Sequence, residues 1–316
     1  MKTKRYLICM ILCSMLIITV DRACREIPVD KKGLLGRDFR LFQGTKAWEL
    51  AKAVEDENIE GIKFQVNKVG IPVDYKEERF GETLLMLAVR NNKYMSVKTL
   101  LELGADPNEP NDTIHNWGEN AIIIASEFSR ISPKILKLLL EYGGSPNSVC
   151  RGKQEYNDEW IPIRHFPLYD AVPIFGDFEK VRILVEAGAD VNMQTEDTGA
   201  GAIEVAIIRD RMDVLLYLLE HGGDYYKKFE RQDFSSPSPS PSYYVDILYM
   251  LRLCFYPIGS EEYKYKLKVI DFLNKRGLDY KSSEIPNKGS DNAIEIIKKE
   301  IKPKTEEELR EYIQHY

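Results

Sequence analysis

The amino-acid sequence predicts an all-α solenoid, a row of stacked helix-turn-helix units with long inserted loops and helical ends. Three observations predict it. Residues 81–108 hold two short apolar-faced helices separated by a polar break, similar stretches recur on both sides, and a glycine follows each second helix. A helix pair of this size cannot bury its apolar face alone, so the repetition predicts that neighbouring units pack against one another.

The unit at 81–108 shows the pattern most completely. Thr83 stands where its hydroxyl can cap the first amides of a helix with apolar positions at 3.6-residue spacing. The polar run 91–93 ends that helix, and a second helix follows. Gly104 ends the second helix, at a position that favours a left-handed backbone, and Asp106 and Asn108 predict a turn after it.

The other units are imperfect copies of this one. Asn120 replaces Thr83 as a helix cap, and Pro167 takes the first helical position of a later helix, where its missing donor costs nothing. The glycines after the second helices stand at 70, 104, 143, 188, 222 and 277, with gaps of 34, 39, 45, 34 and 55. The predicted units span about 45–74, 75–108, 109–147, 148–192, 193–225 and 226–280.

The order of these features resembles the ankyrin repeat, whose signature is G-x-T-P-L-H-x-A-A followed by L-L-L-x-x-G-A-D-x-N. Leu84 and Met86 stand where that family has Pro and His. The resemblance covers about residues 45–280 and is strongest at 75–225. It implies a curved array that binds other proteins. The matching residues are Gly81, Thr83, Leu85, Ala88, Leu100, Leu101, Gly104, Ala105, Asp106 and Asn108.

Departures from an even repeat length predict inserted loops, and the segments outside the repeats predict how the array begins and ends. Gaps longer than the ~33-residue ankyrin period imply inserted loops at 148–163 and 227–242, and the second carries SSPSPSPS, which we expect to be extended. Residues 281–316 predict closing helices, one at 293–301 and one that opens with Thr305-x-x-Glu308, a capping box. Residues 24–44 predict a tether whose later part, 39–42, packs on the first unit.

The first 23 residues have the pattern of a secretory signal. Lys2, Lys4 and Arg5 precede an apolar run from Tyr6 to Val20, which is shorter than the ~20 residues of a membrane-spanning helix. Ala23-Cys24 resembles the junction at which bacterial lipoproteins are cut and lipidated, although Asp21 stands where that pattern has an aliphatic residue. We therefore expect export to a bacterial cell envelope, in the periplasm or at the outer membrane, with a lipid anchor on Cys24. The alternative is cleavage nearby without lipidation.

Composition limits the classes of partner. The chain has 316 residues, 44% of them hydrophobic and 30% charged, and a formal net charge of −6. Removing residues 1–23 takes away a net +3 and leaves −9. An acidic body is a poor match for phosphate backbones, so we expect no nucleic acid, and we expect a monomer. Of five cysteines, Cys9 and Cys13 lie in the signal, and the spacing of Cys150 and Cys254 indicates no disulfide framework.

The sequence lacks the familiar catalytic motifs. It has no phosphate-binding glycine loop, HExxH, GxSxG or CxxC pair. His115, Cys150 and His165 lie in or next to two adjacent loops, which leaves a metal-assisted or hydrolytic enzyme as an alternative, although no ligand pair has the spacing of a fixed site. We expect no enzyme activity, no cofactor and no metal.

The resemblance implies that a partner protein binds in a concave groove formed by the loop tips and the ends of the first helices. Trp117, Phe80, Phe128 and Trp160 are the candidate aromatic anchors, since such residues commonly dominate protein interfaces; for Trp160 the alternative is that it covers an inserted loop. The predicted lining residues are Arg79, Phe80, Glu82, Arg90, Asn91, Asn116, Trp117, Glu119, Glu127, Phe128, Trp160, Ile163, His165, Ile174, Thr198, Ile208 and Arg209.

Three functions remain open. The first is a non-catalytic, lipid-anchored binding scaffold in the envelope, with an inhibitor or immunity protein against a toxin as its narrower form. The second is the loop-borne enzyme near His115 and His165. The third is a structural component of the envelope.

Overall fold

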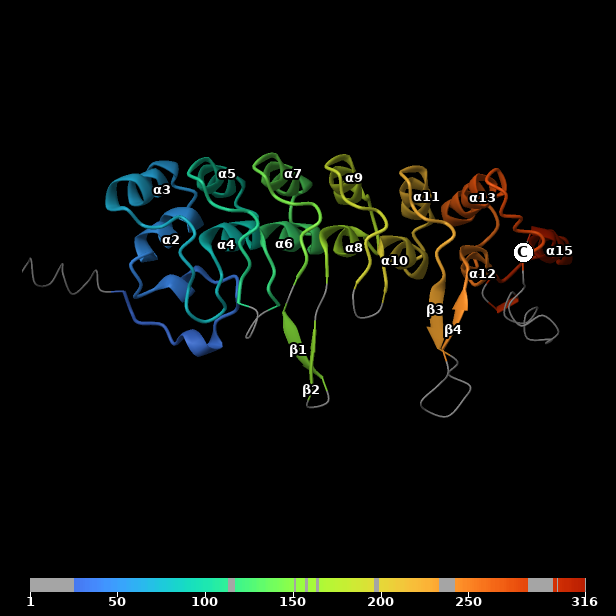
Figure 1. Cartoon of the computed structure of the whole chain (residues 1–316), viewed down its shortest axis with the longest axis horizontal. Helices are drawn as coiled ribbons and strands as arrows, with labels where there is room; N and C mark the ends of the chain where they lie inside the picture. Colours follow the sequence, from blue (N-terminus) through green and yellow to red (C-terminus); the bar gives the residue numbers. More distant parts are fainter. Residues whose placement is uncertain are drawn as a thin grey trace, which may run out of the picture.

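The chain forms two rows of helices joined by loops and hairpins (Figure 1). The computed structural model describes residues 26–112, 117–150, 152–156, 159–162, 165–195, 199–232, 242–283, 298–299 and 301–315. The inner row is α2 (Trp48–Glu55), α4 (Leu84–Arg90), α6 (Ala121–Glu127), α8 (Pro167–Ala171), α10 (Ala202–Ile208) and α12 (Ile247–Arg252). The outer row is α3 (Ile59–Phe64), α5 (Tyr94–Glu102), α7 (Pro133–Glu141), α9 (Glu179–Glu186), α11 (Met212–Glu220) and α13 (Glu261–Asn274).

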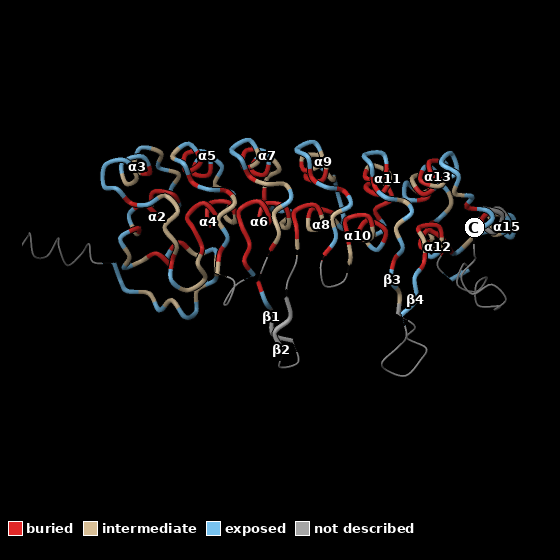
Figure 2. The backbone as a smooth tube through the Cα atoms, viewed as in Figure 1, coloured by how far each residue is buried: buried red, intermediate tan, exposed pale blue. Residues whose placement is uncertain are grey.

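The core runs along the inner row. Figure 2 shows the inner helices buried over most of their length, whereas the outer helices alternate buried and exposed faces. Residues 84–89 of α4 and 121–126 of α6 are all buried. A helix that is apolar all round must be covered on every side, and here α4, α6, α8 and α10 contact one another in sequence while the outer helices cover their backs. The predicted all-α solenoid is confirmed.

The predicted helix ends are also confirmed. Thr83 Oγ1 accepts a hydrogen bond from Met86 N at 3.3 Å, and Asn120 Oδ1 accepts one from Ile123 N at 3.0 Å. Ser260 caps α13, and Thr305 Oγ1 caps α15 (Glu306–His315) by accepting from Glu308 N. The Glu308 carboxylate in turn accepts a hydrogen bond from Lys304 N. The six glycines after the outer helices all have positive φ, between 80° and 95°.

Asparagines after the outer helices connect successive units. Asn108 Nδ2 donates to Gly143 O at 2.9 Å, and Asn108 Oδ1 accepts from Ser145 N at 2.7 Å. Asn147 makes the same two bonds to Gly188 O and Asp190 N, and Asn192 makes them to Gly222 O and Asp224 N. Sequence reasoning assigned these residues only to a turn. Their side chains also hold each unit at a fixed offset from the next.

The inserted loops contain strands, which the sequence analysis did not predict. β1 (Lys153–Tyr156) pairs antiparallel with β2 (Glu159–Pro162), and β3 (Phe229–Gln232) pairs with β4 (Ser242–Val245). A long inserted loop leaves many backbone donors and acceptors that need partners, and pairing satisfies them. Both hairpins project below the inner row (Figure 1). The Ser/Pro segment at 233–241 lies outside the described residues.

The N-terminal end is more compact than the predicted tether. A 3₁₀ turn at Phe39–Phe42 buries Phe39, Leu41 and Phe42, as expected. A second turn at Lys31–Gly33 is also held, because Arg79 donates to the carbonyls of Lys31 and Leu34. Residues 31–42 therefore form a cap over the first unit. The signal segment 1–23, Cys24 and most of the predicted helix at 293–301 lie outside the described residues.

The asparagine bridges generate a stability prediction. Replacing Asn147 with Ala removes two hydrogen bonds between units and lowers the free energy of unfolding by about 1–2 kcal/mol. Asn147→Asp keeps the accepting oxygen and loses the donor, so we expect a smaller loss of stability. The first unit already has this arrangement, because Asp74 accepts from Asp106 N. Urea unfolding measures both, with Asn67→Ala on the exposed surface as the control. Equal stability of all three variants would contradict a role for the bridges.

Candidate functional site

Three adjoining hollows follow the ends of the inner helices, and together we call them the groove. The N-terminal hollow, of about 580 Å³, lies where α4 and α6 end. The central hollow, of about 640 Å³, lies where α6 and α8 end, and the C-terminal hollow, of about 600 Å³, lies beyond α10. Glu127 borders the first two, and Ile174, Phe175 and Arg209 border the last two.

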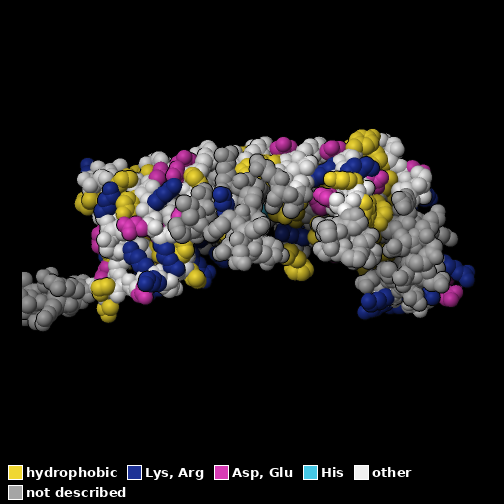
Figure 3. All heavy atoms as spheres, turned by 60° about the horizontal axis from the view of Figure 1, so that its bottom comes forward, with side chains coloured by type: hydrophobic (Ala, Val, Ile, Leu, Met, Phe, Trp, Pro, Cys, Tyr) yellow, Lys and Arg dark blue, Asp and Glu magenta, His cyan; other side chains and the backbone are white. Residues whose placement is uncertain are grey.

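The N-terminal hollow brings together most of the residues predicted for this part of the groove. Figure 3, which looks at the underside, shows Lys and Arg side chains gathered among apolar ones over the N-terminal units. Arg130 stacks on Phe128 with its guanidinium carbon 4.5 Å from the ring centroid, and Arg79 stacks on Phe80 at the same distance. The predicted residues that line this hollow are Phe80, Glu82, Arg90, Trp117, Glu119, Glu127 and Phe128.

A buried ion network forms the floor of the N-terminal hollow. Arg90 Nη2 lies 3.0 Å from Glu82 Oε1 and 2.6 Å from Glu119 Oε2, and Asn111 donates to Glu82 at 3.1 Å. Burial opposes the charge of Arg90, but the two carboxylates raise its pKa above the usual value. Glu82 and Glu119 are only 0% and 5% exposed. They therefore hold Arg90 in place, whereas the sequence analysis expected them to touch a partner.

Several predicted residues lie elsewhere. Arg79 and Asn91 hold the N-terminal cap, since Asn91 Nδ2 donates to Arg37 O at 2.8 Å and Arg79 donates as described above. Trp117 lines the N-terminal hollow and is 42% exposed, and its backbone carbonyl accepts from Gly152 N at 2.7 Å, next to the start of β1. Asn116, Ile163, Thr198 and the side chain of Trp160 lie outside what the structure describes.

Acidic side chains crowd the central hollow. Glu127, the last residue of α6, lies near Glu119 and Asp170, and burial together with these two carboxylates raises the pKa of Glu127 to about 7. Burial also raises the pKa of Asp170, which the hydrogen bond from His165 partly opposes. His165 Nδ1 lies 3.3 Å from Asp170 Oδ1. Sequence reasoning found Glu127 and His165 and missed Asp170, because a carboxylate inside a short helix carries no motif.

A buried lysine closes the end of α6. Lys180 Nζ donates to Ala125 O at 2.6 Å and to Phe128 O at 2.7 Å, reaching from α9 in the next unit. The last carbonyls of a helix have no partner within it, so this ammonium satisfies them. Burial lowers the pKa of Lys180 to about 8. The side chain is a structural connection between units and is not available to a ligand.

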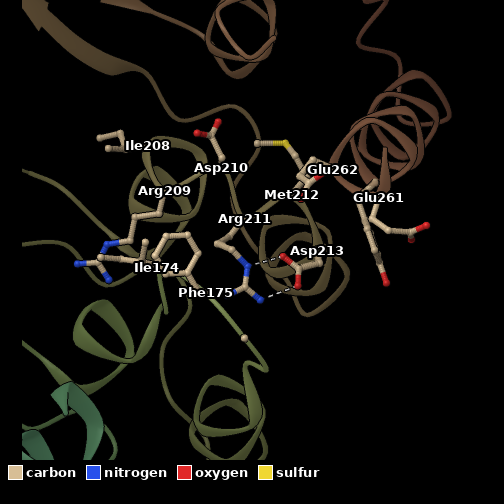
Figure 4. A pocket seen from close by; sticks show the side chains of 12 residues that line it. Ile174, Phe175, Ile208, Arg209, Asp210, Arg211, Met212, Asp213, Glu261 and Glu262 are labelled. Atoms are coloured by element: carbon tan, nitrogen blue, oxygen red, sulfur yellow. Dashed lines mark hydrogen bonds and ion pairs between the residues drawn. The ribbon is translucent and has the colours of Figure 1, made fainter. Parts of the chain in front are cut away.

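Apolar side chains protrude between the central and C-terminal hollows. Ile174, Phe175 and Ile208, which we call the apolar ridge, are 58%, 86% and 59% exposed. Figure 4 shows Ile174 beside the ring of Phe175, with Ile208 and Arg209 from the end of α10 close by. Beyond them Arg211 pairs with Asp213 at 2.6 Å. The sequence analysis named Ile174, Ile208 and Arg209 and missed Phe175. The available signal was an aromatic residue between Ile174 and Gly176, in the short segment that joins two helices.

The described residues give no support to a metal centre or a membrane span. Among them, no group of three or more His, Cys, Asp and Glu side chains is arranged to hold a metal ion. His115 of the alternative metal site lies outside those residues. Cys150 and Cys254 are both buried, and neither forms a disulfide in the described part of the chain. None of the helices described is long and apolar enough to cross a membrane.

Comparison with known proteins agrees with this architecture. Residues 50–150 match the family model described as ankyrin repeats (3 copies). A curated "Putative ankyrin repeat protein" of Coxiella burnetii (strain RSA 493 / Nine Mile phase I) is 28% identical over 135 residues, which are 40% of this chain and 38% of the relative. The chain thus spans well under half the length of that relative.

The carboxylates of the central hollow generate a pH prediction. Because the folded state holds a proton on Glu127 up to about pH 7 and the unfolded state releases it near the ordinary value of 4.5, stability falls as pH rises between those values. Glu127→Gln removes this loss, so the variant should melt at a higher temperature than the wild type at pH 8 and at a similar one at pH 4.5. Thermal melts across pH 4–8 test this, with Glu186→Gln at the exposed end of α9 as the control. A wild type and variant with parallel profiles would refute it.

Proposed function

This chain is an ankyrin-repeat protein, and we propose that it acts as a non-catalytic scaffold that holds another protein in the groove. The apolar ridge is the observation that carries the proposal. The inner helices bury almost all of their apolar residues, yet Ile174, Phe175 and Ile208 stay exposed and line one hollow near the helix ends. Exposed apolar side chains that adjoin one another and are rimmed by charges mark protein interfaces more often than chance.

The surroundings of the ridge fit an interface with a single centre. Arg209 and the Arg211–Asp213 pair provide charges around it, and the hollows on both sides can receive side chains from a partner. Interfaces commonly place a few buried aromatic or aliphatic anchors at the centre and polar groups at the rim. Phe175, which protrudes furthest, is the expected anchor, and Trp117 at the other end of the groove is the second.

The location of the scaffold is a further part of the proposal. The basic start, the short apolar run and Ala23-Cys24 support export and a lipid anchor in a bacterial envelope. An acidic, envelope-held binder also suits an inhibitor or immunity protein that protects the producing cell against a toxin. This narrower role rests on the charge and the N-terminal pattern alone.

Loss of the ridge should weaken partner binding without unfolding the protein. A photo-crosslinking residue at position 175, introduced in the producing cell, captures the partner for identification. Affinity for the purified partner should then fall about tenfold or more in Phe175→Ala/Ile208→Ala, since anchors of this kind contribute over ~1.4 kcal/mol. The melting temperature should change little, because both side chains are already exposed.

The matched control is Phe64→Ala, an exposed phenylalanine at the end of α3 in the outer row. A partner that binds the ridge variant and the wild type with equal affinity would refute the groove as its site.

The anchor has its own test. Cells that express the full chain and are labelled with a fatty acid should incorporate it into the wild type and not into Cys24→Ser. The wild type should fractionate with membranes, and the variant should be released. Equal labelling of the two proteins, or labelling of neither, would refute lipidation at this residue.

A further inference from the structure

We propose that the central hollow receives a basic side chain, arginine or lysine, that the bound protein inserts between Glu127 and Asp170. This inference rests on the proposed scaffold function and specifies the chemistry of the partner. It is carried by a buried carboxylate oxygen that has no donor among the described residues, and by the charges and aromatic rings around it.

Asp170 has an unsatisfied oxygen. Its side chain is 7% exposed and lines the hollow, and among the described residues nothing donates a hydrogen bond to its buried Oδ2. Its other oxygen, Oδ1, lies 3.3 Å from His165 Nδ1. A buried acceptor left unpaired costs roughly 1–3 kcal/mol, and more when it is charged. The position therefore favours an incoming donor that carries positive charge.

The cations already present near Asp170 are engaged elsewhere. Lys180 donates to Ala125 O and Phe128 O, Arg209 donates to Val172 O, and Arg90 pairs with Glu82 and Glu119. Arg90 partly opposes the raised pKa of Glu127 and Arg209 that of Asp170, but burial and the neighbouring carboxylates outweigh them, so both pKa values stay above their usual range. Electrostatic complementarity of this kind contributes specificity for a partner of opposite charge.

The walls of the hollow suit a long side chain with a cationic end. Ile174 and Phe175, which are both exposed, offer apolar contact for an alkyl stem at the entrance. Tyr169 and His165, whose ring centroids lie 5.6 Å apart, stand next to the carboxylates and can face a guanidinium or an ammonium group. The side chain of His165 is 42% exposed, so its ring lies at the surface of the hollow.

The proton balance gives the inference a second readout. Glu127 faces Glu119, Asp170 and Arg90, and Asp170 faces His165, Glu119 and Arg209. Burial and the neighbouring carboxylates raise the pKa of Glu127 to about 7, so the free hollow holds a proton on Glu127 near neutral pH; burial also raises the pKa of Asp170. A bound cation lowers the pKa of Glu127, so binding should release a proton and tighten as pH rises from 6 to 8.

The test uses the purified chain and three blocked pentapeptides, Gly-Gly-X-Gly-Gly, in which X is arginine, lysine or the uncharged citrulline. Amide chemical shifts in NMR spectra report binding at residues 165–176. We expect the arginine or the lysine peptide to bind at least about tenfold more tightly than the citrulline peptide, and the better of the two identifies the side chain. Equal binding by all three peptides, or none by either basic peptide, would overturn the inference.

Two variants and a control locate the effect. Asp170→Asn and Glu127→Gln should each weaken the basic peptide about tenfold and reduce the proton release measured by calorimetry in buffers of different ionisation enthalpy. Asp177→Asn, at an exposed rim carboxylate that pairs with Arg182 at 2.7 Å, should change affinity less than about twofold. Unchanged affinity in both Asp170→Asn and Glu127→Gln would overturn the inference, and Glu127→Gln serves alone if Asp170→Asn does not fold.

Failure here is distinguishable from failure of the scaffold proposal. A partner whose affinity falls in Phe175→Ala/Ile208→Ala but not in Asp170→Asn would support the scaffold function and refute the inserted basic side chain. A partner whose affinity changes in neither variant would refute both proposals.

Discussion

The structure depends on one constraint, which is that no helix pair in this chain can bury its own apolar face. The inner helices are five to eight residues long, α8 having five and α2 eight, and isolated helices of that length are unstable in water. Each is stable only because the previous and the next unit cover it. The asparagine bridges at 108, 147 and 192 fix the offset at which this happens, so burial and backbone hydrogen bonding select the same arrangement. Uniform stacking then places all the inner helix ends along one edge.

That edge carries the proposed binding groove, and the helix ends along it leave carbonyl groups without partners within their own helices. The chain satisfies some of them with side chains from the neighbouring unit, as Lys180 does for α6 and Arg211 does for Pro173. Such connections use up cationic groups close to the carboxylates of Glu127 and Asp170. The groove is therefore acidic at its centre for a structural reason, and the same edge carries the apolar ridge where α8 and α10 stop.

The repeat pattern made much of the fold predictable. Thr83, Asn120 and Ser260 act locally, so their capping role follows from the residues next to them. The hairpins were not predictable, because their pairing joins segments without a short turn signal. In the groove, Glu127, Phe128 and Ile208 could be placed by their position in the repeat. Asp170 and Lys180 could not, since their environment depends on burial by other units. The burial of Glu82 could not be predicted either, because its charge is compensated by Arg90, which lies eight positions away in the sequence.

The two features of the groove that lower stability point to the same explanation. A carboxylate oxygen buried without a donor and a phenylalanine 86% exposed both cost free energy in the isolated protein. Both lie within one continuous surface, since Phe175 and Asp170 line the same hollow. Local features that oppose stability in this way are typical of functional sites, and a partner with an apolar anchor site and a basic side chain would relieve both at once.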